Sequence, residues 1–521
     1  MFSADAPQLL HADAVQQIVR IAAGHIEGNS RDHDGVLSYK GIPYAAPPLG
    51  PLRWAAPRPA ASWLGVRPAV QFGSRCISAW KSDPTPTPSS EDCLTLNVWT
   101  SAGKVTEKRP VMVWIHGGGF EFGSSADPST DGTRLASKGV VVVSFNYRVG
   151  VFGFLAHPDL DREGPSGDYG LQDQLAALRW VQDNIAYFGG DPANVTLFGE
   201  SAGAHAIGIL MASPLSHGLF HKAIGQSGAF WDSARGSLET HVEALSRGVT
   251  LSKELGNLSL QELRALPAEK VNAAGLWDFT THPGTTAFAP NIDGFVVPEA
   301  PASRFYARKQ MKIPLLAGWN AHEDLPFRAL ALPHDNAQQF REAASAYFGP
   351  ENLDEFLVLY PAKNDEEATA SAFALAGDLT ISEQTWQWID LQKRAGERAV
   401  YGYRFGYTSP YVPVASHLVD VPFVFGTLTP QFLVHGTMPP CAEDRAVAEL
   451  MQNYWVAFAS TGDPNRPGLP EWPAYTSHDQ VLILDSTSPI AQQVPEAVRF
   501  AFLARRRQDG ALPRNESRDR K

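Results

Sequence analysis

The chain has 521 residues, of which 44% are apolar and 19% are charged, the balance of a globular protein that can bury a large core. Its 43 Lys and Arg stand against 55 Asp and Glu, and the formal net charge of −12 argues against nucleic acid and anionic membrane surfaces as partners. No apolar run approaches the ~18 residues that span a bilayer, and the start of the chain lacks the basic-then-apolar pattern of a signal peptide, so we expect a soluble chain without an integral membrane segment.

Short β-branched and apolar runs alternate with helix-like stretches along the chain. Apolar residues from Leu171 to Ile185 recur at spacings of three and four, which predicts a helix over 169–187, and a second helix-like stretch covers 202–212. Uniformly apolar strands that alternate with helices indicate an α/β fold, with a mostly parallel sheet covered on both faces. The predicted strands are 95–99, 111–115, 139–144, 195–198, 313–318 and 400–405.

The chain contains no linker that would divide it, and no internal repeat or long low-complexity segment. We therefore expect one domain over residues 1–521, with helical insertions near 232–308 and 333–384 that lie over the site. The Pro-rich stretches 43–59 and 84–88 predict surface loops. The basic cluster that begins at Arg505–Arg507 is expected to be a solvated tail.

Three cysteines are too few for a disulfide scaffold. Cys76 and Cys93 bracket the Pro/Ser-rich stretch 81–90, and Cys441 is left over. Spacing alone leaves both a bridge and two free thiols open. A bridge would favour a periplasmic or secreted location, because disulfides persist in oxidising compartments, and its absence would favour the cytoplasm.

The pentapeptide Gly199-Glu200-Ser201-Ala202-Gly203 follows an apolar run and opens the helix-like stretch 202–212. Strand, Gly-x-Ser-x-Gly and helix in this order are typical of a nucleophile elbow, a strained turn that exposes a serine hydroxyl above a parallel sheet. A serine hydroxyl is a poor nucleophile at neutral pH, so acyl transfer also needs a base, an acid that orients the base, and donors for the oxyanion. Ser201 is the predicted nucleophile, and in this fold the acid and the base follow it along the chain.

The run His116-Gly117-Gly118-Gly119-Phe120 follows the predicted strand 111–115. Its backbone N–H groups have no side chains to block a substrate, which suits an oxyanion hole formed by Gly118 and Gly119 with the amide of Ala202. A plain glycine turn is the alternative interpretation. The elbow in the same chain favours the oxyanion hole.

Further segments match a known family in chain order: Gly41–Pro48 with Leu52–Trp54, Glu91–Val98, Asn146–Arg148 with Gly153–Leu155, Gly167–Asp173 and Phe188–Pro192. With these segments and the two motifs above, most of the chain resembles the type-B carboxylesterase/lipase family of α/β-hydrolases, and in character it is closest to the bacterial carboxylesterases. The resemblance implies one α/β-hydrolase domain, a Ser-Glu-His triad, and a disulfide between Cys76 and Cys93.

The resemblance also assigns the remaining catalytic roles. The segment 318–323 matches the family's acid segment and gives the role of acid to Glu323, with the adjacent Asp324 as a rival because the family usually has a small residue there. The segment 415–425 matches the base segment and gives the role of base to His417. Asp420 stands where the family has Glu, a departure that we expect to affect packing more than proton transfer. Ser227 resembles the family's serine that supports the triad.

Glu200 places a negative charge beside the nucleophile, where it either favours the imidazolium or a cationic group, or simply holds the elbow. Aromatic residues next to the motifs are candidate pocket walls, although each is equally explained as core. They are Phe120, Phe122, Phe230, Trp231 and Phe327.

We therefore expect a carboxylesterase that acts on a small-molecule ester and needs no metal or other cofactor, since neither a phosphate-binding loop nor a His-Glu-x-x-His motif is present. Simple aliphatic or aryl esters are the first expectation for the substrate. Aromatic-acid esters of the feruloyl or chlorogenate type and mycotoxin esters are the alternatives. A binding scaffold without activity, known within the family, is disfavoured because all three triad residues are present. The oligomeric state and the natural ester are left open.

Overall fold

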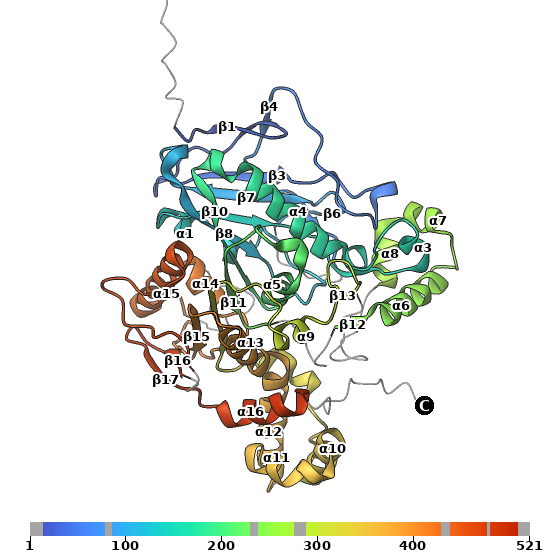
Figure 1. Cartoon of the computed structure of the whole chain (residues 1–521), viewed down its shortest axis with the longest axis vertical. Coiled ribbons are helices and arrows are strands. Elements are labelled where there is room, and N and C mark those ends of the chain that lie inside the picture. Colours follow the sequence, from blue (N-terminus) through green and yellow to red (C-terminus); the bar gives the residue numbers. More distant parts are fainter. Residues whose placement is uncertain are drawn as a thin grey trace, which may run out of the picture.

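A computed structural model describes residues 14–78, 86–229, 238–275, 288–428, 438–476 and 480–508. A large twisted sheet crosses its centre (Figure 1). In spatial order its strands are β17 (Ile490–Gln493), β16 (Gln480–Leu484), β15 (Val400–Phe405), β14 (Leu315–Asn320), β11 (Lys222–Gln226), β10 (Gly190–Glu200), β8 (Arg109–Ile115), β9 (Val141–Phe145), β7 (Thr95–Thr100) and β3 (Leu37–Pro43). In this order, each strand from β16 through to β9 pairs in parallel with its neighbour, which confirms the mostly parallel sheet. Strands β17, β7 and β3 add antiparallel pairs at the two edges.

Strand β8 shows why the sheet needs cover on both sides. Val111, Val113 and Ile115 pack into one hydrophobic cluster, while Met112 and Trp114 pack into another. Successive side chains of a strand point to opposite faces, so a strand that is apolar throughout must be buried on both. Helices α4 (Tyr169–Asn184), α5 (Ala202–Ala212) and α13 (Glu383–Arg394) contribute to the first cluster, and α1 (Thr133–Ser137), α14 (Val421–Phe425) and α15 (Ala442–Thr461) contribute to the second.

The remaining helices connect or extend this frame. The predicted helix 169–187 is α4 followed by a 3₁₀ turn, and the predicted helix 202–212 is α5. The other α-helices are α2 (Gly150–Phe154), α3 (Pro158–Asp161), α6 (His241–Glu254), α7 (Leu260–Ala265), α8 (Ala268–Ala274), α9 (Pro301–Tyr306), α10 (Ala337–Phe348), α11 (Leu353–Leu359), α12 (Asp365–Gly377) and α16 (Ala497–Gln508). Small sheets are formed by β1 (Ile18–Ile21), β2 (Gly24–Glu27) and β4 (Val66–Pro68), by β5 (Arg75–Cys76) with β6 (Ser89–Ser90), and by β12 (Glu239–Thr240) with β13 (Asn291–Ile292).

The two regions expected to be insertions are helical where they are described. Helices α6 to α9 fall in the first, and α10 to α12 fall in the second. Figure 1 shows α10, α11, α12 and α16 gathered at the end of the molecule opposite the sheet β1-β2-β4. These four helices share a separate small hydrophobic cluster that includes Phe340, Phe356 and Phe502. That the whole chain forms one domain stays a prediction.

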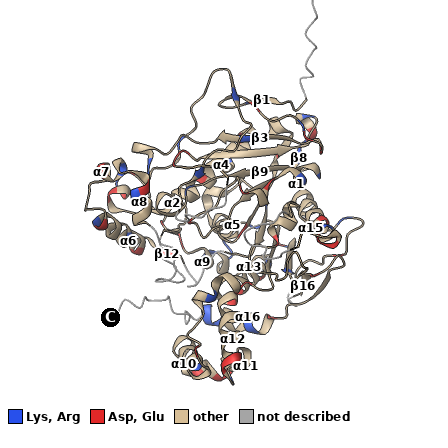
Figure 2. Ribbon diagram, turned by 180° about the vertical axis from the view of Figure 1, so that it is seen from behind, with Lys and Arg blue, Asp and Glu red and all other residues tan. Residues whose placement is uncertain are grey.

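Two expectations about surface segments were wrong in part. Arg505–Arg507 belong to α16 and not to a solvated tail: Arg505 pairs with Glu355 of helix α11, whose acidic residues are red in Figure 2, and Arg507 Nε lies 2.6 Å from Glu383 Oε2 with both side chains buried. The rest of the basic cluster, from Arg514 to Lys521, lies outside the described residues. The stretch 43–59 is an exposed loop around Leu49 but enters the core at Trp54, which is 1% exposed and whose indole donates to Val151 O. In both cases polar partners far away in the sequence hold the buried side chain.

Cys76 and Cys93 form a disulfide, and Cys441 is an exposed free thiol. The predicted bridge is thus present, and it ties strand β5 to the segment that follows β6. Within the described ranges, no helix combines the length and the apolar character needed to cross a membrane.

Candidate active site

The register of the parallel strands brings the predicted motifs to one edge of the sheet. Gly199 of β10 pairs with Ile115 of β8, and Glu200 pairs with Gln226 of β11, which in turn pairs with Gly318 of β14. The glycine run, Ser201, Ser227 and the acid segment all follow these strand ends directly. Carboxyl ends of parallel strands share one edge of a sheet, so residues far apart in the chain become neighbours there.

Ser201 occupies a strained turn between β10 and α5. Its φ and ψ are 53° and −123°, a conformation that side-chain-bearing residues rarely adopt and that tends to persist at functional sites. The two flanking glycines are required by close packing, because a Cβ at 203 would lie 2.0 Å from Ile115 O and one at 199 would lie 2.8 Å from the same oxygen. The Gly-x-Ser-x-Gly spacing therefore reflects the approach of the helix to strand β8.

The glycine run after β8 packs against this turn. A Cβ at Gly117 would lie 2.8 Å from Glu200 O and 3.2 Å from Ser201 Cβ, so only glycine fits there. Gly118 and Gly119 have φ of 104° and 63°, in the left-handed region that favours glycine. The ring of His116 stacks on Tyr147 at 4.3 Å, and the Tyr147 hydroxyl donates to His116 O. Gly117 thus lies against the Ser201 turn, and the predicted oxyanion donors Gly118 and Gly119 follow it directly in the chain.

Glu323 and His417, 94 residues apart in the sequence, meet at this edge. His417 Nδ1 lies 2.5 Å from Glu323 Oε2, and both residues are buried. The backbone joins the two loops as well, since His322 N donates to Ala415 O. A carboxylate at Nδ1 fixes the tautomer of the imidazole and leaves Nε2 for proton transfer.

The other oxygen of Glu323 is also held. Oε1 accepts hydrogen bonds from the Ser227 hydroxyl at 2.6 Å and from Asn320 N at 2.7 Å. Ser227 itself has a φ of 53° and donates its backbone N–H to Gly318 O. These contacts fix the orientation of the carboxylate, as expected for a serine that supports a triad acid.

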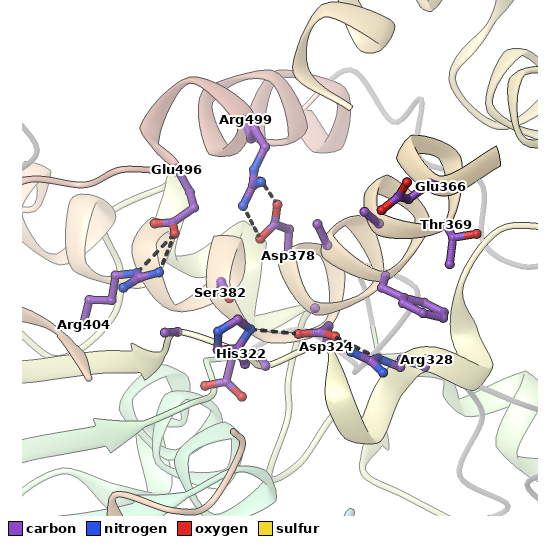
Figure 3. Close-up of a pocket in the computed structure, with 16 residues that line it drawn as sticks. His322, Asp324, Arg328, Glu366, Thr369, Asp378, Ser382, Arg404, Glu496 and Arg499 are labelled. Atoms are coloured by element: carbon purple, nitrogen blue, oxygen red, sulfur yellow. Dashed lines mark hydrogen bonds and ion pairs between the residues drawn. The ribbon is translucent and has the colours of Figure 1, made fainter. Parts of the chain in front are cut away.

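Asp324, the rival acid, points away from His417. It pairs with Arg328 at 2.9 Å and lies 3.7 Å from His322, and hydrogen bonds and charge from these residues outweigh burial and lower the pKa of its carboxyl. These three residues and Glu323 line a cavity of about 690 Å³ together with residues of α12, the π-helical segment Asp378–Ser382, α16 and β15. Figure 3 shows His322, Asp324 and Arg328 in this cavity. Neither Ser201 nor His417 lines that cavity. The geometry therefore gives the contact with the imidazole to Glu323.

Glu200 lies on the opposite side of the imidazole. Its Oε1 is 3.1 Å from His417 Nε2, its side chain is 1% exposed, and its oxygens receive no hydrogen bond from the described part of the chain. Burial lowers the pKa of His417, but Glu200 and Glu323 outweigh it and raise that pKa to about 9. Burial, with Asp420 and Glu323, raises the pKa of Glu200. The pKa values of both groups are thus raised, and the two side chains titrate as an interacting pair. Among the described residues, the Ser201 hydroxyl has no hydrogen bond to His417.

Behind the triad lies a polar cluster that the sequence did not reveal. Asp420 is fully buried and accepts hydrogen bonds from Gln226, Tyr403 and Asn320 at 2.9, 2.9 and 3.3 Å. Burial raises the pKa of Asp420, and all three donors act against that rise. A buried acid with this many donors holds its neighbours in place, in line with the expected packing role. Only the apolar residues around position 420 signalled that it would be buried.

The aromatic residues predicted to line the pocket differ in their surroundings. Phe327 packs edge-on against His417 at 5.2 Å between ring centres, so it contacts the predicted base. Phe120 is 8% exposed and packs edge-on against Phe154, which makes it largely core. Phe122 is half-buried next to Gly118. Phe230 and Trp231 lie outside the described residues. In the described ranges, no group of three or more His, Cys, Asp or Glu side chains is arranged to hold a metal ion.

Comparison with known proteins adds an independent finding. Residues 15–503 match the sequence profile of the carboxylesterase family. The chain is 36% identical over 492 residues to the fumonisin B1 esterase of Sphingopyxis macrogoltabida, covering 92% of this chain and 88% of that protein. It is 34% identical over 489 residues to the para-nitrobenzyl esterase of Bacillus subtilis, covering 90% and 95%. The crystal structure of a Geobacillus stearothermophilus carboxylesterase superposes with a TM-score of 0.79 at 33% identity, over 96% of this chain and all of that one.

Proposed function

The chain belongs to the carboxylesterase family, and from this premise we propose that Ser201, His417 and Glu323 are the residues with which it hydrolyses carboxylic esters. The fold is that of the α/β-hydrolases, and the activity is that of a serine ester hydrolase on small-molecule esters. The non-catalytic scaffold has no support. The observation that carries the residue assignment is the 2.5 Å contact between His417 and Glu323 at the sheet edge where Ser201 occupies its strained turn.

In the proposed acylation step, Ser201 Oγ bonds to the ester carbonyl carbon and its proton passes to His417 Nε2. The tetrahedral oxyanion accepts hydrogen bonds from the backbone N–H groups of Gly118, Gly119 and Ala202, each worth about 3 kcal/mol in a transition state of this kind. The carbon–oxygen bond of the alcohol then breaks, and Nε2 returns the proton to the departing oxygen.

Deacylation repeats the sequence with water as the nucleophile. His417 takes a proton from water, the hydroxide oxygen bonds to the acyl carbon, and Ser201 Oγ leaves with the proton from Nε2. Glu323 accepts the hydrogen bond from Nδ1–H and stabilises the imidazolium in both steps. We place the hydrogen bond between Ser201 and Nε2 in the substrate complex, because such contacts often tighten only when substrate is bound.

In this proposal Glu200 raises the pKa of His417 by stabilising its imidazolium form, and it does not attack the substrate. Its carboxylate and the Ser201 hydroxyl approach the same nitrogen, so a serine that turns toward Nε2 must take the place of the Glu200 contact. A half-buried Phe327 against the imidazole provides an aromatic surface for part of the ester.

The assignment is tested with an organophosphonate that phosphonylates serine hydrolases. We expect peptide mass mapping to find the adduct on Ser201, and Ser201→Ala to lose both labelling and turnover of p-nitrophenyl butanoate. Ser227→Ala, which keeps the nucleophile, is the matched control and should still be labelled. An adduct on another residue, or full turnover in Ser201→Ala, would show that the nucleophile is misassigned.

For the substrate we propose simple aliphatic or aryl esters first. The similarity to a fumonisin B1 esterase supports including a mycotoxin ester in the panel, and aromatic-acid esters complete it. Separate variation of the acid and the alcohol in such a panel identifies the preferred class by kcat/KM. A mycotoxin ester turned over at least tenfold faster than the simple esters would replace the first proposal.

The disulfide is compatible with an extracellular or periplasmic location, and we propose that the chain works there. Thiol titration of the unfolded, unreduced protein isolated from its native compartment should find one free thiol, that of Cys441. Three free thiols would overturn this location.

A further inference from the structure

His205 is a buried imidazole beside the nucleophile that the proposed mechanism does not use. It lies on α5 one turn after Ser201 and is 7% exposed. Its backbone N–H and its Nδ1 each lie 2.9 Å from Ser201 O. A carbonyl oxygen can only accept hydrogen bonds, so Nδ1 must carry the hydrogen and donate it. In the neutral ring this leaves a lone pair on Nε2.

The ring stays neutral at working pH. Burial lowers the pKa of His205 to about 4, with a smaller lowering from His417 and an opposing rise from the bond to Ser201. Nε2 is therefore an acceptor. It is buried, and no described residue donates a hydrogen bond to it. Buried polar atoms in folded proteins nearly always have a partner, so an acceptor of this kind next to a nucleophile calls for a donor from outside the chain.

The position of the ring next to Ser201 indicates that this donor belongs to the acyl group of the substrate. Helical side chains lean toward the N-terminus of their helix, and the N-terminus of α5 is the end that carries Ser201 and the amide of Ala202. His205 lies three positions after Ala202, about 4.5 Å along the helix axis. Gly228 makes room for the ring, because a Cβ there would lie 2.9 Å from Nδ1.

We propose that His205 Nε2 accepts a hydrogen bond from a hydroxyl on the acyl group of the substrate, so that the enzyme prefers esters of hydroxy acids. The inference rests on the proposed function, since it requires the acyl group to be bound at Ser201. An acyl chain without a donor leaves Nε2 unpartnered, and a site built around a buried polar group discriminates against such an analogue.

The test compares p-nitrophenyl esters that differ in one group. The acyl groups are 3-hydroxybutanoyl, as both enantiomers, 2-hydroxybutanoyl, butanoyl, and 3-methoxybutanoyl, which keeps the oxygen of a hydroxy acid, adds one methyl group and has no donor. For one hydroxy ester at least, we expect kcat/KM about three- to tenfold above the methoxy ester, the range of one neutral hydrogen bond.

Two variants separate the acceptor from the rest of the side chain. His205→Asn places an amide near the position of Nδ1 and has nothing at Nε2, so the ratio of hydroxy to methoxy kcat/KM should fall to about one. His205→Gln reaches the position of Nε2 and should restore a preference. His221→Asn, a partly buried histidine that accepts from Val195 N, is the matched control and should keep the wild-type ratio. Ratios within one variant cancel any general loss of activity.

The proposal is overturned if no hydroxy ester is preferred by the wild-type enzyme, if His205→Asn keeps the preference, or if His205→Gln shows none. Organophosphonate labelling of Ser201 is measured in each protein. Labelled enzymes without a hydroxy preference contradict the role of His205 alone, whereas absence of labelling at Ser201 in the wild-type enzyme contradicts the proposed function itself.

Discussion

Replacing Glu200 by Gln should shift the pH dependence of ester hydrolysis toward acid. Glutamine keeps the shape of the side chain and removes its charge, 3.1 Å from the nitrogen that must be unprotonated for catalysis. The negative charge stabilises the imidazolium form of His417 and so favours the inactive state of the base. Loss of that charge must lower the pKa of His417.

The size of the shift follows from the geometry. A rise of the His417 pKa from 6.5 to about 9 corresponds to roughly 3 kcal/mol in favour of the imidazolium, and this is what the carboxylates supply beyond the opposing effect of burial. Coulomb energy varies inversely with distance, so Glu200 at 3.1 Å and Glu323 at 2.5 Å from the ring nitrogens supply attractions of similar size. We therefore expect Glu200→Gln to move the acid limb of the profile by about one to two pH units toward acid.

The assay is kcat/KM for p-nitrophenyl butanoate at constant ionic strength, because this quantity reports the ionisation of the free enzyme. For the wild-type enzyme the acid limb should lie above 6.5, the value of an ordinary imidazole. Glu262→Gln, at an exposed position on α7, is the control and should leave the limb unchanged. A wild-type limb at or below 6.5, or a Glu200→Gln limb that does not move toward acid, would refute the reasoning.

Three further changes test other parts of the site. Ser227→Ala removes a 2.6 Å hydrogen bond to the triad acid and should lower kcat about tenfold with little change in KM or melting temperature. The size of the effect follows because one hydrogen bond to a charged group is worth about 1.5 kcal/mol. An unchanged kcat would contradict a positioning role for Ser227. Gly203→Ala would place a Cβ 2.0 Å from Ile115 O and should destabilise the protein by about 3 kcal/mol or more, measured by urea unfolding, and a wild-type midpoint would contradict the packing argument. Replacing both Cys76 and Cys93 by Ser opens a loop with a sequence separation of 17 and should cost about 3 kcal/mol of stability in the same assay while Ser201 labelling persists.

Much of the catalytic plan is local in the sequence. The elbow at Ser201 and the glycine run before Phe120 are short contiguous motifs, because each must form one tight turn at the end of one strand. The parallel sheet was equally visible, since strands buried on both faces are apolar throughout. The disulfide and the positions of Glu323 and His417 came from family resemblance, and spacing alone left them open.

Local pattern failed where a residue's partners lie far along the chain. Arg507 looked like part of a solvated tail until α16 was seen to place it against buried Glu383. Asp420 looked like a minor departure and proved to be a fully buried acid with three donors. In both cases the sequence shows the charge but not its partner.

The sequence by itself determined the α/β frame, the nucleophile elbow and the family, because these depend on periodicity and on contiguous residues. Family resemblance assigned the acid to Glu323 and left Asp324 as a rival, and only the tertiary structure decided between them, with Glu323 on Nδ1, Glu200 near Nε2 and Asp324 turned toward Arg328. The tertiary structure also left a lone pair on His205 Nε2 without a donor among the described residues. The physical reason is that a charge or a hydrogen bond acts over a few ångströms of space, and strand register, not chain distance, sets which groups come that close.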